Sequence, residues 1–159
     1  LERLQVDVLQ PAQAAGYRRI HLAGVSLGGF GSLLYWRYSQ EGHGVDVSSA
    51  LLLTPYVGEP EYFAHRIDPS QSPQLVTEEK NIWPWLETLA PEQAQNWYIA
   101  VAEQDSFYQA NMTFAELVPD NHVFVAGGGH NWNSWRELWP RMLHQLKRDF
   151  FTSPTDESP

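Results

Sequence analysis

The chain contains the stretch RRIHLAGVSLGG at residues 18–29, in which an apolar run leads directly into a serine between glycines. Residues 19–25 are predicted to form a β-strand, and a helix is expected over residues 27–40. The pentapeptide Gly24-Val25-Ser26-Leu27-Gly28 has the form G-x-S-x-G, typical of a nucleophilic serine on a sharp strand-to-helix turn. Glycines two positions to either side would remove side chains that collide in such a turn. The alternative is a glycine-rich turn whose serine has no chemical role.

Three further apolar runs, at residues 49–54, 97–102 and 122–126, are predicted to be strands. The first of them is continuous rather than alternating, which is typical of a strand covered on both faces of a parallel sheet. Each run is separated from the previous one by enough chain for a helical crossover. The order therefore predicts an α/β fold, a three-layer doubly wound sheet of about four parallel strands.

The chain is long enough to form one domain, which we expect over residues 1–151. Apolar residues at helical spacing predict a first helix over residues 1–15 and a last helix that begins near Ser134, where Ser134 and Glu137 have capping-box spacing. A lid-like excursion is expected at about residues 57–82, where prolines are frequent and no period is sustained. Residues 152–159 have nothing apolar to bury and are expected to form a flexible tail.

Charge and composition exclude several classes of partner. The chain has 10 Lys and Arg against 19 Asp and Glu, a formal charge of -9, which argues against nucleic acid and anionic membrane surfaces. No run approaches the roughly 20 apolar residues of a membrane span. Cysteine is absent, which excludes disulfides, thiolate metal sites and a cysteine nucleophile. No metal is expected, because the histidines lack a metal-ligand spacing such as HExxH, and no cofactor is expected, because phosphate- and dinucleotide-binding glycine motifs are missing. A cytoplasmic location is expected.

A serine nucleophile needs a base to accept its proton and a carboxylate to orient that base. Asp105 follows the third predicted strand and His130 follows the fourth. The carboxyl ends of parallel strands lie at one edge of a sheet, so Ser26, Asp105 and His130 can converge there. Asp105 is alternatively an N-cap of the next helix, and Glu103 or Asp120 could be the acid instead. Glu103 comes earlier in the strand exit, and Asp120 precedes the fourth strand, near the opposite edge.

Aromatic side chains are abundant, with seven each of Trp, Tyr and Phe. Several lie in predicted loops near the carboxyl edge of the sheet, where they could line an apolar pocket. The candidates for substrate binding are Tyr56, Phe63, Trp83, Phe107 and Trp132. The alternative is that any one of them packs in the core or in the lid.

The serine motif at residues 24–29, Asp105 at a strand end and the stretch GHNWNSW at residues 129–135 together resemble the α/β-hydrolase superfamily. The last stretch is similar to the branch that includes esterase D-like enzymes. The resemblance implies a serine esterase, in which Ser26 attacks the carbonyl, His130 relays the proton and Asp105 orients the imidazole. The backbone N–H of Leu27 would then be one oxyanion-hole donor.

The resemblance covers nearly the whole chain but the second half of the family fold only. The strands that precede the nucleophile in the family are missing, which would leave residues 19–25 as an edge strand and allow a homodimer through that edge. The expected ligand is a small ester, either a carboxylic ester or a thioester. The competing hypothesis is a non-catalytic binding or assembly module derived from a hydrolase.

Overall fold

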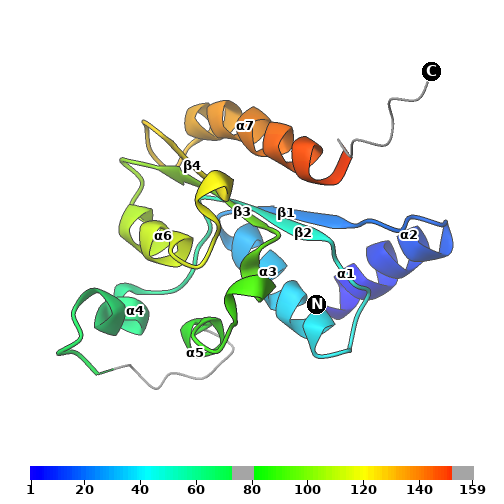
Figure 1. Cartoon of the computed structure of the whole chain (residues 1–159), viewed down its shortest axis with the longest axis horizontal. Coiled ribbons are helices and arrows are strands. Elements are labelled where there is room, and N and C mark those ends of the chain that lie inside the picture. Colours follow the sequence, from blue (N-terminus) through cyan, green and yellow to red (C-terminus); the bar gives the residue numbers. More distant parts are fainter. Residues whose placement is uncertain (73–80, 152–159) are drawn as a thin grey trace.

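A four-stranded parallel sheet forms the centre of the computed structural model, which describes residues 1–72 and 81–151 (Figure 1). The strands are β1 (His21–Val25), β2 (Ser49–Leu53), β3 (Trp97–Ala102) and β4 (Val123–Ala126), and they lie side by side in chain order. Val25 pairs with Leu53, Leu53 with Ala100, and Ala102 with Ala126, so all four carboxyl ends meet at one edge. The predicted parallel sheet is confirmed.

Burial along each strand follows its position in the sheet. Every residue of β2 and β3 is buried, as their unbroken apolar sequences indicate. The outer strands β1 and β4 alternate between buried and more exposed residues, and Ala23 in the middle of β1 is exposed. Within the described part of the chain, β1 pairs with β2 and with no other strand, so it lies at an edge as expected.

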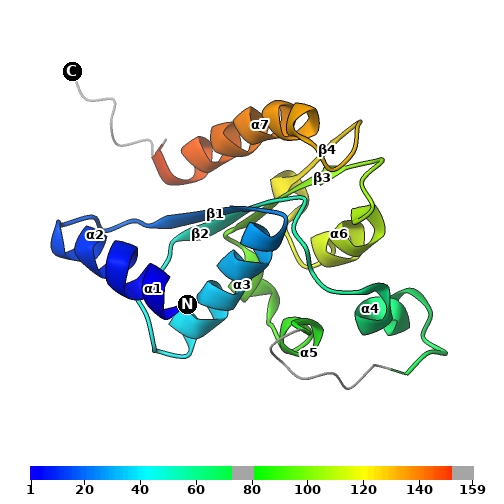
Figure 2. The ribbon, with the colours of Figure 1, turned by 180° about the vertical axis from the view of Figure 1, so that it is seen from behind.

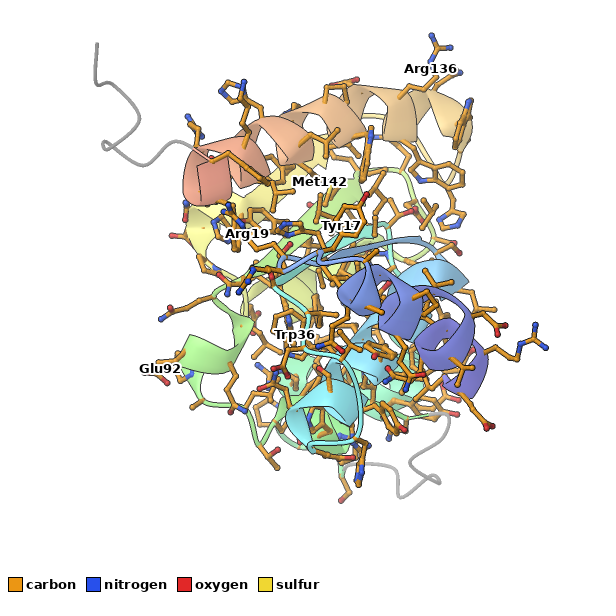
Figure 3. The ribbon with its side chains drawn as sticks, turned by 90° about the vertical axis from the view of Figure 1, so that its right-hand side faces the viewer. Tyr17, Arg19, Trp36, Glu92, Arg136 and Met142 are labelled. Atoms are coloured by element: carbon orange, nitrogen blue, oxygen red, sulfur yellow. The ribbon has the colours of Figure 1, made fainter. Side chains whose placement is uncertain are left out.

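Helices cover both faces of the sheet (Figures 1 and 2). On one face lie α3 (Leu27–Gln40) and α6 (Tyr108–Ala115), with Leu33 and Phe114 in a core that includes Leu52 and Ile99 of the strands. The other face is covered by α7 (Trp132–Phe151), whose Met142 points toward the sheet in Figure 3. The three-layer, doubly wound architecture is therefore confirmed, because alternate residues of each central strand enter different cores.

The last helix begins two residues earlier than predicted, and the expected capping box at Ser134 is wrong. The side chain of Asn131 accepts the backbone N–H groups of Asn133 at 3.0 Å and Ser134 at 3.4 Å, so Asn131 caps the helix. Ser134 is instead buried in the first turn, with its hydroxyl against Gly128.

The amino-terminal helix consists of three consecutive pieces, α1 (Glu2–Leu4), the π-helical η1 (Gln5–Leu9) and α2 (Gln10–Ala14). Pro11 lies in the first turn of α2, where its missing N–H is tolerated, and the wider π-helical turn immediately precedes it. Gln5 anchors this helix to the rest of the molecule, because its side-chain oxygen accepts the Tyr35 hydroxyl and, at 3.2 Å, the backbone N–H of Val45.

The predicted excursion contains a helix that the sequence pattern did not indicate, α4 (Pro60–Ile67). Its proline is at the start, where the fixed φ favours helix, and its Phe63 is buried. Residues 73–80 lie outside the described part, and α5 (Trp83–Leu86) and η2 (Pro91–Ala94) follow. The short η3 (Asp120–His122) leads into β4, which starts one residue later than expected. The predicted tail, residues 152–159, also lies outside the described residues.

Candidate active site at the carboxyl edge of the sheet

Ser26 stands at the junction of β1 and α3 with φ 54° and ψ -120°. A non-glycine residue in this region costs about 1–3 kcal/mol and persists only where its surroundings fix it. Backbone hydrogen bonds to the chain that leaves β2 fix it here: the Ser26 N–H donates to Leu53 O at 3.0 Å, and the Tyr56 N–H donates to Ser26 O at 3.0 Å. The serine is thus held on a strained turn at the start of a helix, as the motif predicts.

The glycines around Ser26 do not share one role. A Cβ at Gly24 would lie 2.5 Å from the Gly29 backbone nitrogen and closer still to Gly28, so position 24 admits glycine alone. A Cβ at Gly28 would meet nothing within 4 Å, which shows that the expected collision there is wrong. The second glycine required by space is Gly29, where a Cβ would lie 2.7 Å from the Pro55 side chain.

Asp105 and His130 are joined by a hydrogen bond between Oδ2 and Nδ1 at 2.7 Å. The other carboxylate oxygen of Asp105 accepts the Phe107 backbone N–H at 2.8 Å. Asp105 therefore holds the turn before α6, close to the alternative considered from sequence, and contacts the imidazole at the same time. Its side chain is 1% exposed and that of His130 is 28% exposed, so the carboxylate is shielded while the ring remains accessible. Glu103 and Asp120, the two rival acids, are both exposed.

The loops that carry Asp105 and His130 are tied to each other by Gln104. Its backbone N–H donates to Gly128 O at 2.8 Å, and its side-chain oxygen accepts the Gly128 N–H. Gly128 has φ 93°, and a Cβ there would lie 2.5 Å from the Ser134 hydroxyl, so glycine is required. Sequence reasoning missed Gln104, because nothing in a local pattern distinguishes a glutamine that reaches across to the next strand end.

Two aromatic rings contact the imidazole of His130 edge to face. The ring centroid of Phe107 lies 5.1 Å from that of His130, and the centroid of Trp135 lies 5.2 Å from it. Since Asp105 occupies Nδ1, the nitrogen left for a serine proton is Nε2. No hydrogen bond joins Ser26 to His130 among the described residues, and both are partly exposed. Catalytic hydrogen bonds often shorten and align only once substrate is bound, so Ser26 and His130 remain the candidate nucleophile and base.

The five aromatic candidates separate into two groups. Phe107 contacts His130, Tyr56 lies edge to face with Phe107 at 5.7 Å, and Trp132 is 66% exposed. Phe63 and Trp83 are buried and pack against each other at 5.4 Å between ring centroids. These two are core residues, the alternative left open by the sequence, because the chain after β2 folds back over the α3 face.

Tyr56 remains a neutral phenol in this environment. Burial and the hydrogen bond from its hydroxyl to Glu59, at 2.9 Å, raise the pKa of Tyr56 to about 12. A phenol with this pKa offers a donor rather than a base near neutral pH, so His130 is the group at this edge suited to accept a proton.

An apolar cavity of about 250 Å³ lies between β1 and the first turns of α7. Its lining is apolar apart from Arg136 and consists of Ala23, Gly24, Val25, Leu53, Trp132, Trp135, Arg136 and Trp139. Arg136 points away from the sheet in Figure 3. The cavity adjoins both halves of the site, because Val25 precedes Ser26 and Trp135 contacts His130.

Residues 1–72 and 81–151 contain no group of three or more His, Cys, Asp or Glu placed to hold a metal ion. None of the helices in these ranges is both long enough and apolar enough to cross a membrane.

No protein-family model matches the sequence, and no curated protein matches it. Solved structures do match. A ferulic acid esterase superposes with a TM-score of 0.61 and 19% identity over 94% of this chain and 61% of its own. A second match is MGS-MChE2, an alpha/beta hydrolase enzyme from the metagenome of sediments from the lagoon of Mar Chica, Morocco. It superposes with a TM-score of 0.56 and 16% identity, over 88% of this chain and 66% of its own.

The fold is that of the α/β hydrolases. The chain spans 61–66% of the length of these two hydrolase structures. At such low identity the likeness concerns the fold alone, because one fold can carry many different activities.

Proposed function

We propose that this chain is a serine hydrolase that acts on carboxylic esters, with Ser26 as nucleophile, His130 as base and Asp105 as the acid that orients the base. The observation that carries the proposal is that a strained serine, φ 54°, and a hydrogen-bonded Asp105–His130 pair lie at the same edge of the sheet. Backbone strain in a non-glycine residue at the edge where an acid and a base gather is typical of a functional position.

The geometry supports the following sequence of proton transfers. His130 accepts the Ser26 hydroxyl proton at Nε2 while the Ser26 oxygen attacks the ester carbonyl carbon. Asp105 accepts the Nδ1–H of the ring at 2.7 Å, which fixes the tautomer and stabilises the imidazolium that forms. The imidazolium then donates its proton to the leaving alcohol, and the acyl group stays on Ser26. In the second half of the reaction, a water molecule deprotonated by His130 attacks the acyl carbon, the bond to Ser26 Oγ breaks, and the imidazolium returns the proton to Ser26 as the acid leaves.

The start of α3 supplies stabilisation for the negative charge on the carbonyl oxygen. The N–H of Leu27 is the first of α3, a position for which a helix provides no acceptor of its own, and the positive end of the helix dipole lies at the same place. The N–H of Leu27 is therefore one proposed oxyanion donor. A single such donor typically contributes about 100- to 1,000-fold to the rate.

The surroundings of the site favour an ester with an apolar or aromatic acyl group. The cavity beside Val25 and Trp135 is apolar and, at about 250 Å³, can hold one ring or a short chain. Tyr56, Phe107 and Trp132 remain the proposed contacts for substrate. Phe63 and Trp83 are excluded as substrate contacts because both are buried in the core.

A covalent probe tests the proposal directly. A fluorophosphonate should label the chain once, on a peptide that contains Ser26, and Ser26→Ala should abolish both labelling and hydrolysis of nitrophenyl esters. Ser70→Ala is the matched control, because Ser70 is exposed and its hydrogen bonds to other described residues go to Asp68 in its own turn. Unchanged turnover in Ser26→Ala would remove the nucleophile assignment. A folded chain with neither labelling nor turnover would instead support the non-catalytic binding module.

A further inference from the structure

Thr54, the residue directly after β2, has a backbone conformation that its side chain disfavours. Its φ is 38°, and it shares a positive φ with Ser26 alone among the described non-glycine residues. A β-branched residue in this region is a clear outlier, retained where the surroundings require it. Thr54 is completely buried, and its N–H donates to Ala100 O at 2.8 Å, which extends the pairing of β2 with β3.

The segment around Thr54 holds the nucleophile in place. Leu53 accepts the backbone N–H of Ser26, and Tyr56 donates its own N–H to Ser26 O, each at 3.0 Å. Between them, the Pro55 carbonyl accepts the side-chain amide of the buried Asn111 at 2.7 Å. Residues 53–56 therefore form a rigid frame, and the position of Ser26 depends on the path of this frame.

Trp135, in the first turn of α7, reaches this frame from the opposite face of the sheet. Its indole N–H donates to the Thr54 hydroxyl at 2.9 Å, across 81 positions in the sequence. The same indole lies edge to face with the imidazole of His130 at 5.2 Å and an interplanar angle of 88°. One rigid side chain thus contacts the base on one side and the frame of the nucleophile on the other.

We propose that Thr54 and Trp135 are positioning residues, whose hydrogen bond sets the separation between Ser26 and His130. This inference rests on the proposed function. Asp105 fixes the ring at Nδ1, and Phe107 contacts it from another side and lies edge to face with Tyr56 of the frame, but no hydrogen bond of either side chain to residues 53–56 is found among the described residues. Without the indole N–H, α7, which directly follows the loop that carries His130, loses its hydrogen bond to that frame.

The expected consequence is a loss in the chemical step. A displacement of about 1 Å between reacting groups can lower a rate about 100-fold, whereas substrate binding depends on other contacts. Thr54→Val keeps the branched shape and removes the acceptor, and Trp135→Phe keeps an aromatic ring and removes the donor. Each variant should lower kcat for nitrophenyl ester hydrolysis by about 10- to 100-fold with KM little changed.

Coupling and rescue distinguish positioning from general damage. The double variant should be no less active than the less active of the two single variants, because both changes remove the same hydrogen bond. Thr54→Ser, which keeps the hydroxyl, should retain most of the activity. Thr113→Val is the matched control, since Thr113 is also buried but its hydroxyl donates within α6 to Gln109 O. Equal activity in wild type and both single variants, or losses that multiply in the double variant, would overturn the proposal.

A measurement without turnover keeps this inference separate from the proposed function. The ring proton NMR signals of His130, assigned by their absence in His130→Gln, should move in Thr54→Val and stay in place in Thr113→Val. Signals that do not move in Thr54→Val would show that the hydrogen bond does not position the base. Absence of labelling and turnover in the wild type, with signals that do move, would overturn the hydrolase function and leave the positional link intact.

Discussion

Replacing Asp105 by asparagine changes one acceptor into a donor and leaves almost every other contact in place. The side-chain oxygen that accepts the Phe107 N–H at 2.8 Å survives in Asp105→Asn, so the turn before α6 should be kept. The second position, now an amide NH₂, faces the Nδ1 of His130 at 2.7 Å. Two donors cannot face each other, so the imidazole must carry its proton on Nε2 instead, where it cannot accept the Ser26 proton.

The two expected effects differ greatly in size. Stability should fall by about 1.5–3 kcal/mol at most, the value of one hydrogen bond to a charged group, because the buried carboxylate is replaced by a group of the same shape. The rate should fall much more, since the same exchange in Ser-His-Asp enzymes lowers kcat about 10,000-fold. The protein would remain folded and nearly inactive.

Ester hydrolysis under saturating substrate and thermal unfolding of the same samples measure both effects. Asp68→Asn is the matched control. Asp68 accepts the backbone N–H of Ser70, two positions later, as Asp105 accepts that of Phe107, but among the described residues Asp68 has no histidine partner. This variant should retain full activity. An Asp105→Asn protein that keeps a tenth or more of the wild-type kcat would refute the role of Asp105 in orienting His130.

Three further expectations test the fold around the site. Gly24→Ala should destabilise strongly by forcing its Cβ into the α3 backbone, whereas Gly28→Ala should be neutral or stabilise by up to about 1 kcal/mol, as urea unfolding of both would show. Burial and the Arg19 cation lower the pKa of His21, so the native state resists a proton that the unfolded chain accepts. The free energy of unfolding should therefore fall as pH drops below about 6.5, and less so in His21→Gln. Equal pH profiles for the wild type and His21→Gln would contradict this. The edge strand β1 should lead to dimers or aggregates of the isolated chain, and a monomer at every concentration in sedimentation velocity would contradict this.

The sequence by itself determined the four strands and the place of the candidate site. Continuous apolar runs identify β2 and β3 because a strand buried on both faces needs no polar alternation. The strained turn at Ser26 was predictable because its requirement for glycine at position 24 is local. Asp105 and His130 could be chosen because parallel strands bring every carboxyl end to one edge, whatever the length of chain between them.

Only the tertiary structure decided which side chains support that site. Thr54 and Trp135 are 81 positions apart, and Gln104 reaches Gly128 on the neighbouring strand, so no local pattern joins them. Some local signals were present but ambiguous. Asn131 and Ser134 are equally suitable N-cap residues by type, and Asn131 caps the helix while Ser134 is buried against Gly128. Phe63 and Trp83 illustrate the limit most clearly. Their aromatic rings suit a pocket or a core equally well, and long-range packing over the α3 face made them core.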